Sequence, residues 1–173
     1  MLLISLNNAE KSAQHSHAHR LLRECLRPFG IDYREELLAF GGHGKPCLPD
    51  FPGIHFNLSH ARGIAACIVS DRECGIDCEP VREYRPGVMR RAFSGNEQQL
   101  VENLPPEHRD LLFFRLWTLK EAYIKAIGLG LSYPMNKAEF TFSADGTVQG
   151  PSGYRFRQYL IKGKYVVSVC EKE

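Results

Sequence analysis

The sequence predicts an α+β fold, and three patterns carry this prediction. Apolar residues recur at helical spacing in two segments, near residues 18–25 and 107–127. Short segments in which apolar and polar residues alternate lie before, between and after them, which is typical of antiparallel strands. Each half of the chain runs roughly from a helix to antiparallel strands. We therefore expect two similar halves, residues 1–84 and 85–173, with a site between them.

The composition is that of an ordinary globular domain, and it argues against several classes of protein. The 173 residues are 43% hydrophobic and 24% charged, and the net charge of +2 is too small to indicate nucleic-acid binding. No run of about 18 apolar residues predicts a membrane span, and the N-terminus has no signal-peptide core. The six cysteines form no Cys-x-x-Cys pair, which favours buried free thiols over zinc ligands or disulfides. We expect a soluble, cytoplasmic protein without nucleic-acid or membrane partners.

The first helix follows a short strand, Leu2–Leu6, and a polar connection, Asn7–Ser12. Its apolar positions recur at i, i+3, i+4 and i+7, namely Ala18, Leu21, Leu22 and Cys25. Ser12 or Ser16 is its predicted N-cap, and Pro28 ends it. Arg20 lies off this apolar stripe, where a solvated helix face is the alternative to a ligand role.

Residues 32–70 are predicted to form two strands that follow a constrained loop. Residues 32–40 end as a strand, and the loop 41–52 is rich in glycine and proline and presents Lys45. Residues 54–58 alternate, and 63–69 are almost entirely apolar, as in a buried strand. Ser59 and His60 then fall at the turn of this hairpin, where a capping serine and a solvated histidine are the alternatives to ligands.

The segment Gly75-Ile-Asp-Cys-Glu-Pro80 carries the first chemical signal. In a strand, alternation places Ile76 and Cys78 on one face and Asp77 and Glu79 on the other, with the Cα atoms of the two acids about 7 Å apart. Two carboxylates this close repel each other unless a cation lies between them, and a divalent metal is the natural candidate. A solvated edge strand with two acids is the alternative. We expect this strand to complete the first sheet.

The second half is predicted to begin with a basic crossover, residues 82–91. Ser94 and Glu97 have the spacing of a capping box and begin a short helix, in which Glu97 has a capping role. A long helix spans about residues 107–127, and Gly128-Leu-Gly130 ends it. Antiparallel strands are predicted over 138–143, 154–160 and 165–170, with turns at 145–146 and 162–164.

Glu121 and Lys125 lie on a helix that is covered on more than one face. They follow Trp117 at i+4 and i+8, so the charged groups share a face with a large aromatic ring. The alternative is an ordinary Glu–Lys helical ion pair.

Five motifs resemble the 4'-phosphopantetheinyl transferases of the Sfp type. In chain order they are Gly44-Lys-Pro46, Phe56-Asn-Leu-Ser-His60, Gly75-Ile-Asp-Cys-Glu79, Phe93-Ser-x-x-Glu97 and Trp117-Thr-Leu-Lys-Glu-Ala-Tyr-Ile-Lys125. The resemblance covers about residues 17–131. It implies a pseudo-dimer of two similar α/β halves, each a helix packed on an antiparallel sheet. It further implies that coenzyme A binds between the halves and that its phosphopantetheine passes to a serine of an apo acyl or peptidyl carrier protein.

The resemblance also implies roles for individual residues. The metal ligands are Asp77, Glu79 and Glu121, which suit Mg²⁺, with Mn²⁺ as the alternative. Glu121 also takes the proton of the carrier serine, and Lys125 assists departure of adenosine 3',5'-bisphosphate. Lys120 and Lys125 face the phosphates, whereas the nucleotide and its 3'-phosphate are held by Arg20, Lys45, Ser59 and His60.

A docking surface for the carrier is expected on Arg82, Arg85, Arg90 and Arg91, which follow the metal strand. Carrier proteins of this family are typically acidic, so a basic segment attracts them, although a solvated crossover is the alternative. The chain ahead of the first helix is shorter than is usual in the family, and His15, His17 and His19 stand where basic residues are expected. We expect a monomer. The alternative functions are another metal-dependent phosphoryl-transfer or hydrolysing enzyme, or a non-catalytic carrier-binding module.

Overall fold

The computed structural model describes residues 1–6 and 11–173, without the side chains of residues 11–13 and 131. Most of the predicted polar connection, Asn7–Ser12, lies outside the described residues. The elements of the first half, in chain order, are β1 (Leu2–Leu6), α1 (Lys11–Leu26), η1 (Arg27–Phe29), η2 (Glu35–Leu37), β2 (Ala39–Phe40), β3 (Pro46–Cys47), β4 (His55–Ala61) and β5 (Ile64–Ser70).

The second half is longer and more helical. Its elements are β6 (Cys74–Pro80), α2 (Pro86–Ala92), α3 (Gly95–Glu102), α4 (Pro106–Ile127), η3 (Gly130–Ser132), η4 (Met135–Lys137), β7 (Thr141–Phe142), β8 (Val148–Gln149), β9 (Tyr154–Ile161) and β10 (Tyr165–Lys172).

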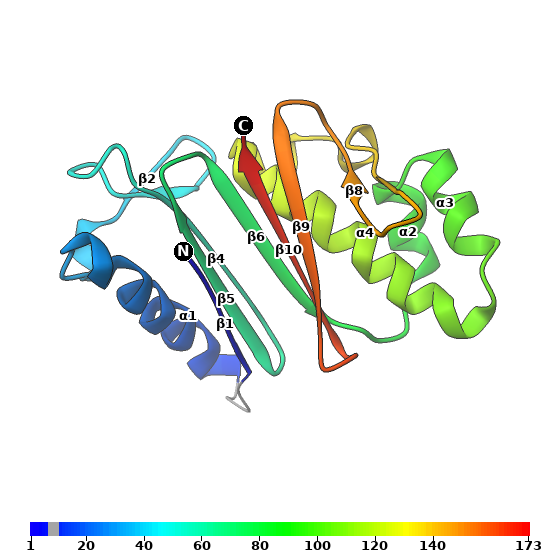
Figure 1. Ribbon diagram of the computed structural model, residues 1–173, viewed down its shortest axis with the longest axis horizontal. Helices are drawn as coiled ribbons and strands as arrows, with labels where there is room; N and C mark the ends of the chain where they lie inside the picture. Colours follow the sequence, from blue (N-terminus) through cyan, green and yellow to red (C-terminus); the bar gives the residue numbers. More distant parts are fainter. Residues whose placement is uncertain (7–10) are drawn as a thin grey trace.

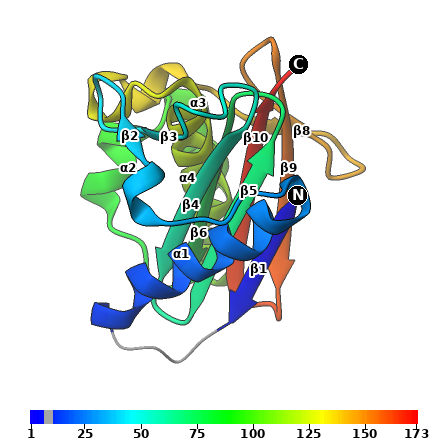
Figure 2. The ribbon, with the colours of Figure 1, turned by 90° about the vertical axis from the view of Figure 1, so that its left-hand side faces the viewer.

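Two three-stranded antiparallel sheets form the centre of the molecule, and each is covered by one helix (Figure 1). The first sheet has the order β1-β5-β4, and α1 packs on it. The second has the order β6-β10-β9, and α4 packs on it. Figure 2, seen from the side of α1, shows this helix crossing the first sheet with α4 behind the strands. This arrangement confirms the predicted α+β fold with two helix-on-sheet halves.

The core is divided among these layers. Leu22 and Cys25 of α1 pack against Phe56, Cys67 and Val69 on one face of the first sheet. On its other face, β5 meets β6 and β10 of the second sheet through Ile64, Ile68, Ile76 and Val167. The alternation of β5 therefore places its apolar residues in two different clusters, one on each face of the sheet.

The prediction that residues 74–78 complete the first sheet was wrong. β6 pairs along its length with β10, so that Asp77 lies opposite Ser168. β4 runs beside β6, but side chains bridge the two strands: Asn57 Oδ1 accepts a hydrogen bond from the Ile76 N–H at 2.9 Å, and Ser59 Oγ accepts one from the Cys78 N–H at 3.2 Å. By sheet membership we describe β6 with the second half, together with β9 and β10. Whether the chain divides functionally at residues 84 and 85 stays a prediction.

α4 lies unusually close to β6, and Gly75 allows it. A Cβ atom on Gly75 would lie 2.0 Å from the Ala122 carbonyl oxygen and 2.5 Å from the Ala126 nitrogen. Ala122 and Ala126 are small and fully buried against the strand. Three small residues therefore bring the helix backbone onto the strand that carries the two acids.

Several local predictions are confirmed. The apolar stripe of α1 is buried, α4 covers the predicted span, and Gly128 ends it with φ +71°. Ser94 and Glu97 form the predicted capping box, with both of its hydrogen bonds. All cysteines are free, and all but Cys47 are buried.

Other local predictions were wrong. Ser16 lies inside α1, and so is not its N-cap. Ser59 and His60 lie within β4, because the hairpin turns one step later, at Arg62–Gly63, where Gly63 has φ +88°. The crossover 82–91 contains the helix α2, and only Thr141–Phe142 of the segment 138–143 is strand. Among the described helices, none is long and apolar enough to cross a bilayer.

Candidate active site

Three acids converge where β6 faces α4. Asp77 and Glu79 project from the same face of β6, as alternation predicted, and Glu121 projects from α4. Asp77 is 6% exposed, and the side chain of Glu79 is 23% exposed. The carboxylate oxygens of the three acids do not all lie within 4.8 Å of one another. They are neighbours that share one charged environment without forming a closed cage.

Lys125 and Ser59 connect this acid group. The Lys125 ammonium lies 2.7 Å from Asp77 Oδ1 and also donates to the Ile76 carbonyl oxygen at 3.2 Å. Ser59 Oγ donates to the same Asp77 oxygen at 2.9 Å and accepts from Lys125 at 3.3 Å. Asp77 of β6 is thus fixed by residues from two other elements, β4 and α4.

The electrostatics of the site suit an added cation. Burial raises the pKa of Glu121, and the Asp77 carboxylate raises it further. Burial also raises the pKa of Glu79, although a hydrogen bond from Arg82 opposes that shift. Burial disfavours the Lys125 ammonium, but Asp77 and Glu121 outweigh this effect and raise its pKa. Lys125 and Arg82 together bring two positive charges against three carboxylates, so negative charge remains.

Asp77 Oδ2 gives a direct test of whether a metal fits. Within residues 1–6 and 11–173, it is the buried side-chain oxygen that has no hydrogen-bond partner. An unpartnered buried carboxylate oxygen costs free energy unless a cation or a donor reaches it. Carboxylate oxygens are the ligands that Mg²⁺ prefers, so the residues present fit this ion.

A cavity of about 370 Å³ opens on one side of the acids. It lies between the β2–β3 loop, β4 and the second half of α4. Glu121, Lys125 and Lys45 line it, together with His43, Gly44, Pro46, Asn57, Ile124, Gly128, Gly130, Tyr133 and Met135. The Lys45 ammonium donates to the Ala126 carbonyl oxygen at 2.7 Å and to that of Cys74 at 3.1 Å. Lys45 therefore joins the loop to the end of α4 while it borders the cavity.

A second cavity, of about 280 Å³, opens on the other side. Glu79 lines it together with Arg82, Glu83, Tyr84, Arg85, Val88, Phe113, Phe114 and Trp117. The Arg82 guanidinium pairs with Glu79 at 2.7 Å and lies 4.7 Å from the centre of the Phe114 ring. The acids thus separate a cavity that contains Lys45 and Lys125 from one lined by aromatic rings.

His60 and Arg20 lie nearer to α1. The His60 ring is 6.4 Å from that of His15, and burial lowers its pKa, as do the nearby His15 and Lys125. Arg20 is exposed and donates a hydrogen bond to His17 on the same helix. Neither His60 nor Arg20 is among the residues that line the two cavities described above. Their roles at the nucleotide stay predictions.

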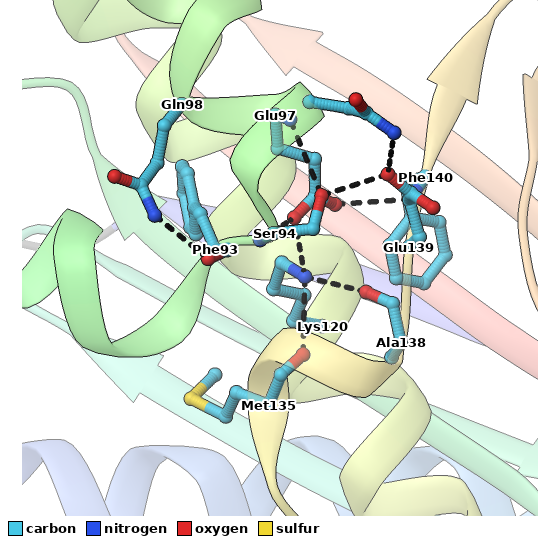
Figure 3. A network of polar contacts seen from close by, with 10 residues as sticks. Phe93, Ser94, Glu97, Gln98, Lys120, Met135, Ala138, Glu139 and Phe140 are labelled. Carbon is cyan, nitrogen blue, oxygen red and sulfur yellow. Dashed lines mark hydrogen bonds and ion pairs between the residues drawn. The ribbon is translucent and has the colours of Figure 1, made fainter.

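Lys120 is not where a phosphate-binding residue would lie. It is fully buried and forms an ion pair with Glu97, also fully buried, at 2.7 Å (Figure 3). Its ammonium also donates to the carbonyl oxygens of Met135 and Ala138. Glu97 in turn accepts from the Ser94 and Phe140 N–H groups. Because every side of the ammonium is in contact with protein, we correct the predicted cofactor-binding role of Lys120 to a structural one.

The four candidate carrier-binding arginines lie on or just before α2. Arg85, Arg90 and Arg91 are exposed, and none of the three has an ion pair in the described part of the chain. Arg91 donates to the Gly87 carbonyl oxygen within the helix. Arg82 instead is engaged with Glu79. Carrier binding by these residues stays a prediction.

Asn57, His43, Tyr133 and Met135 line the first cavity, but were not predicted as site residues. Asn57 could have been predicted from the sequence, since it lies in the Phe56–His60 motif with its side chain on the face opposite Phe56. No sequence pattern predicts Tyr133 and Met135 as site residues, because the turn after α4 brings them to the cavity.

A family model and individual relatives of the chain point to the same family. Residues 73–170 match the 4'-phosphopantetheinyl transferase superfamily. The chain is 34% identical to the 4'-phosphopantetheinyl transferase psf-1 of Bacillus pumilus over 150 residues, 84% of this chain and 64% of that one. It is 31% identical to the 4'-phosphopantetheinyl transferase ffp of Bacillus subtilis over 185 residues, 98% of this chain and 83% of that one.

Among solved structures, a holo-(acyl-carrier-protein) synthase from Bacillus anthracis in complex with CoA (3',5'-ADP) aligns with a TM-score of 0.48 and 18% identity, over 58% of this chain and 96% of that one. The matched segment 73–170 begins one residue before β6 and includes both β6 and α4, the elements that carry the three acids. The chain belongs to the 4'-phosphopantetheinyl transferase superfamily.

Proposed function

We propose that the acid group between the two cavities carries out the reaction of this family, the transfer of 4'-phosphopantetheine from coenzyme A to a serine of a carrier protein. The observation that carries this assignment is the unpartnered Asp77 Oδ2, which lies among Glu79, Glu121 and Lys125. The cavity lined by Lys45 and Lys125 suits the anionic coenzyme A. The opposite cavity, which is lined by aromatic rings, suits the approach of the carrier.

The reaction is a displacement at the phosphorus atom joined to pantetheine. The serine oxygen forms a bond to this phosphorus while the bond to the leaving phosphate oxygen breaks, and adenosine 3',5'-bisphosphate departs. Glu121 accepts the serine proton, for which its raised pKa suits it. Lys125 is placed to stabilise the negative charge that develops on the leaving phosphate.

Asp77, Glu79 and Glu121 would hold Mg²⁺, or Mn²⁺ in its place. When bound, such an ion would supply positive charge against the pyrophosphate of coenzyme A. In the absence of substrate, Lys125 balances part of the charge on Asp77. We further propose that the protein acts as a monomer, since one chain supplies the residues on both sides of the acid group.

The test is a mass-shift assay with coenzyme A, Mg²⁺ and a panel of apo carrier proteins. We expect Glu121→Gln to reduce turnover at least a hundredfold, because a positioned base contributes roughly 10²–10⁴-fold, and Asp77→Asn to reduce it comparably. Glu107→Gln, at an exposed position in the first turn of α4, is the matched control. Normal turnover by either site variant, with an unchanged melting curve, would disprove the assignment.

The same assay separates the alternative functions. A hydrolysing enzyme would consume coenzyme A without adding mass to the carrier. A carrier-binding module would bind the carrier and leave both reactants unchanged.

A further inference from the structure

A second group of metal-ligating side chains lies on the outer side of the first half. His15 and His19 occupy positions i and i+4 of α1, and their Nε2 atoms are 3.1 Å apart. Glu35 begins η2, and its Oε1 lies 3.7 Å from His19 Nδ1. Across the described residues, only this trio of His, Cys, Asp and Glu side chains offers ligand atoms that all lie within 4.8 Å of one another.

The spacing of the two imidazoles agrees with tetrahedral coordination. Two nitrogens bound to one Zn²⁺ at about 2.0–2.1 Å lie about 3.3 Å apart when the angle at the metal is tetrahedral. The observed 3.1 Å between the Nε2 atoms is close to this value. A histidine pair at i and i+4 on one helix face is also the arrangement that helical zinc sites use, and two histidines with a glutamate form a known ligand set.

Tyr33 holds one of the ligands in place. Its hydroxyl lies 2.6 Å from His19 Nδ1, and its side chain is 1% exposed within the core beneath α1. Nδ1 of His19 thus faces the Tyr33 hydroxyl and the Glu35 carboxylate, which leaves Nε2, the nitrogen near His15, to bind an ion. Glu35 would reach this ion by turning its carboxylate away from Nδ1. Metal-binding histidines are commonly oriented by such a contact on the other ring nitrogen.

We propose that His15, His19 and Glu35 bind a transition metal ion of the Zn²⁺ class at a site separate from the acid group. Imidazole ligands suit Zn²⁺ and similar ions, whereas carboxylate oxygens suit Mg²⁺, so the two sites select different metals. The ion joins α1 to the segment that follows it, through Glu35 of η2. Three protein ligands leave a fourth position for water or for an anionic group, and the ring of His60 lies 6.4 Å from that of His15.

The experiment uses the untagged chain of 173 residues in excess Mg²⁺, so that the acid group is saturated. Zn²⁺ is titrated calorimetrically, and Co²⁺ is added as a spectroscopic probe of tetrahedral coordination. We expect one equivalent of Zn²⁺ to bind and the melting temperature to rise. His15→Ala and His19→Ala should abolish this binding, and Glu35→Gln should weaken it. Tyr33→Phe should weaken it about 10–100-fold, as loss of an orienting contact does.

Three controls distinguish this site from others. His17→Gln changes a histidine of the same helix outside the trio, Cys47→Ser removes the exposed thiol, and Asp77→Asn alters the acid group. All three should bind Zn²⁺ as the unmodified protein does. Undiminished binding in both His15→Ala and His19→Ala would overturn the proposal, and loss of binding in Asp77→Asn or Cys47→Ser would place the ion elsewhere. His15 is exposed, so its replacement leaves the fold available for the measurement.

Discussion

Lys125 is the residue on which the charge balance of the acid group depends. Its ammonium pairs with Asp77 at 2.7 Å, so it occupies part of the charge that a divalent cation would balance. A bound metal ion would therefore compete with Lys125 for the Asp77 carboxylate before substrate arrives. Under the proposed function, the phosphate oxygens of bound coenzyme A would offer the ammonium another partner and so relieve this competition.

The replacement Lys125→Met tests this competition. We expect tighter Mg²⁺ binding, because an opposing cation is removed, together with slower transfer, because the leaving phosphate loses its ammonium partner. Calorimetry with Mg²⁺ and the mass-shift assay measure the two effects separately. Lys137→Met, at an exposed lysine of η4, is the control. Unchanged Mg²⁺ affinity in Lys125→Met would show that Asp77 does not bind the ion.

The direction of a side chain was predictable from the sequence where it follows from the local periodicity of a strand or helix. Alternation on β6 correctly placed Asp77 and Glu79 on one face. The prediction for Lys120 was wrong, because it points about 100° away from its neighbour Glu121 on the helix. Periodicity gives the direction of a side chain but does not identify the group that it meets there. Its partner Glu97 comes from a helix whose packing against α4 no local pattern describes.

The boundary between the two sheets is the element on which the site geometry depends. β4 and β6 share no backbone ladder, and the side chains of Asn57 and Ser59 accept hydrogen bonds from the β6 backbone instead. The sequence did not predict this, because strand pairing is a long-range choice: β6 finds β10, which lies about ninety residues later in the chain. In the sequence, a polar residue at position 57 indicates only that this side chain points away from the core, and not that it binds a neighbouring strand.

Asn57→Ala should destabilise this boundary. It leaves the buried Ile76 N–H without its acceptor, which costs about 1–3 kcal/mol. Asn136→Ala makes the same change at an exposed position of η4 and should stay within about 0.5 kcal/mol of the unmodified protein. Denaturant unfolding compares the two. Equal stabilities would mean that water or another group replaces the Asn57 amide.

The buried pair Glu97–Lys120 connects three elements, α3, α4 and the η4 segment whose Met135 lines the first cavity. Lys120→Met leaves a buried carboxylate without its cation, which costs about 3–5 kcal/mol. The double replacement Glu97→Gln with Lys120→Met removes both charges and should recover part of this loss. A double-mutant cycle from unfolding curves measures the coupling. Strictly additive losses would contradict a coupled pair.

At the scale of the whole molecule, the two halves contribute unequally to the site. The second half supplies the three acids and Lys125, whereas the first supplies Lys45, Asn57 and Ser59. The two-half organisation was predictable from the order of elements. The cavity between them was expected only in outline, because its walls are loops such as residues 41–46 and 128–135, whose paths depend on packing.

The positive charge on and just before α2 bears on the encounter with a carrier protein. Arg90 and Arg91 lie in the last turn of α2. Arg85 precedes the helix and lines the cavity that also contains Glu79 and Trp117. An exposed basic group beside the site would attract an acidic carrier and increase the association rate. Such attraction weakens with salt, because the Debye length falls from about 10 Å at 0.1 M to about 3 Å at 1 M.

The double replacement Arg90→Glu with Arg91→Glu should raise the KM for the carrier at least several-fold at low salt, leave the KM for coenzyme A unchanged, and flatten the salt dependence. The matched control is Arg155→Glu with Lys162→Glu, which changes the net charge equally at exposed positions of β9 and the β9–β10 turn. Steady-state kinetics over a range of salt concentrations measure both variants. If the control raises the carrier KM as much as the α2 variant does, net charge rather than the surface of α2 attracts the carrier. If neither changes it, these arginines belong to a solvated helix with no part in docking.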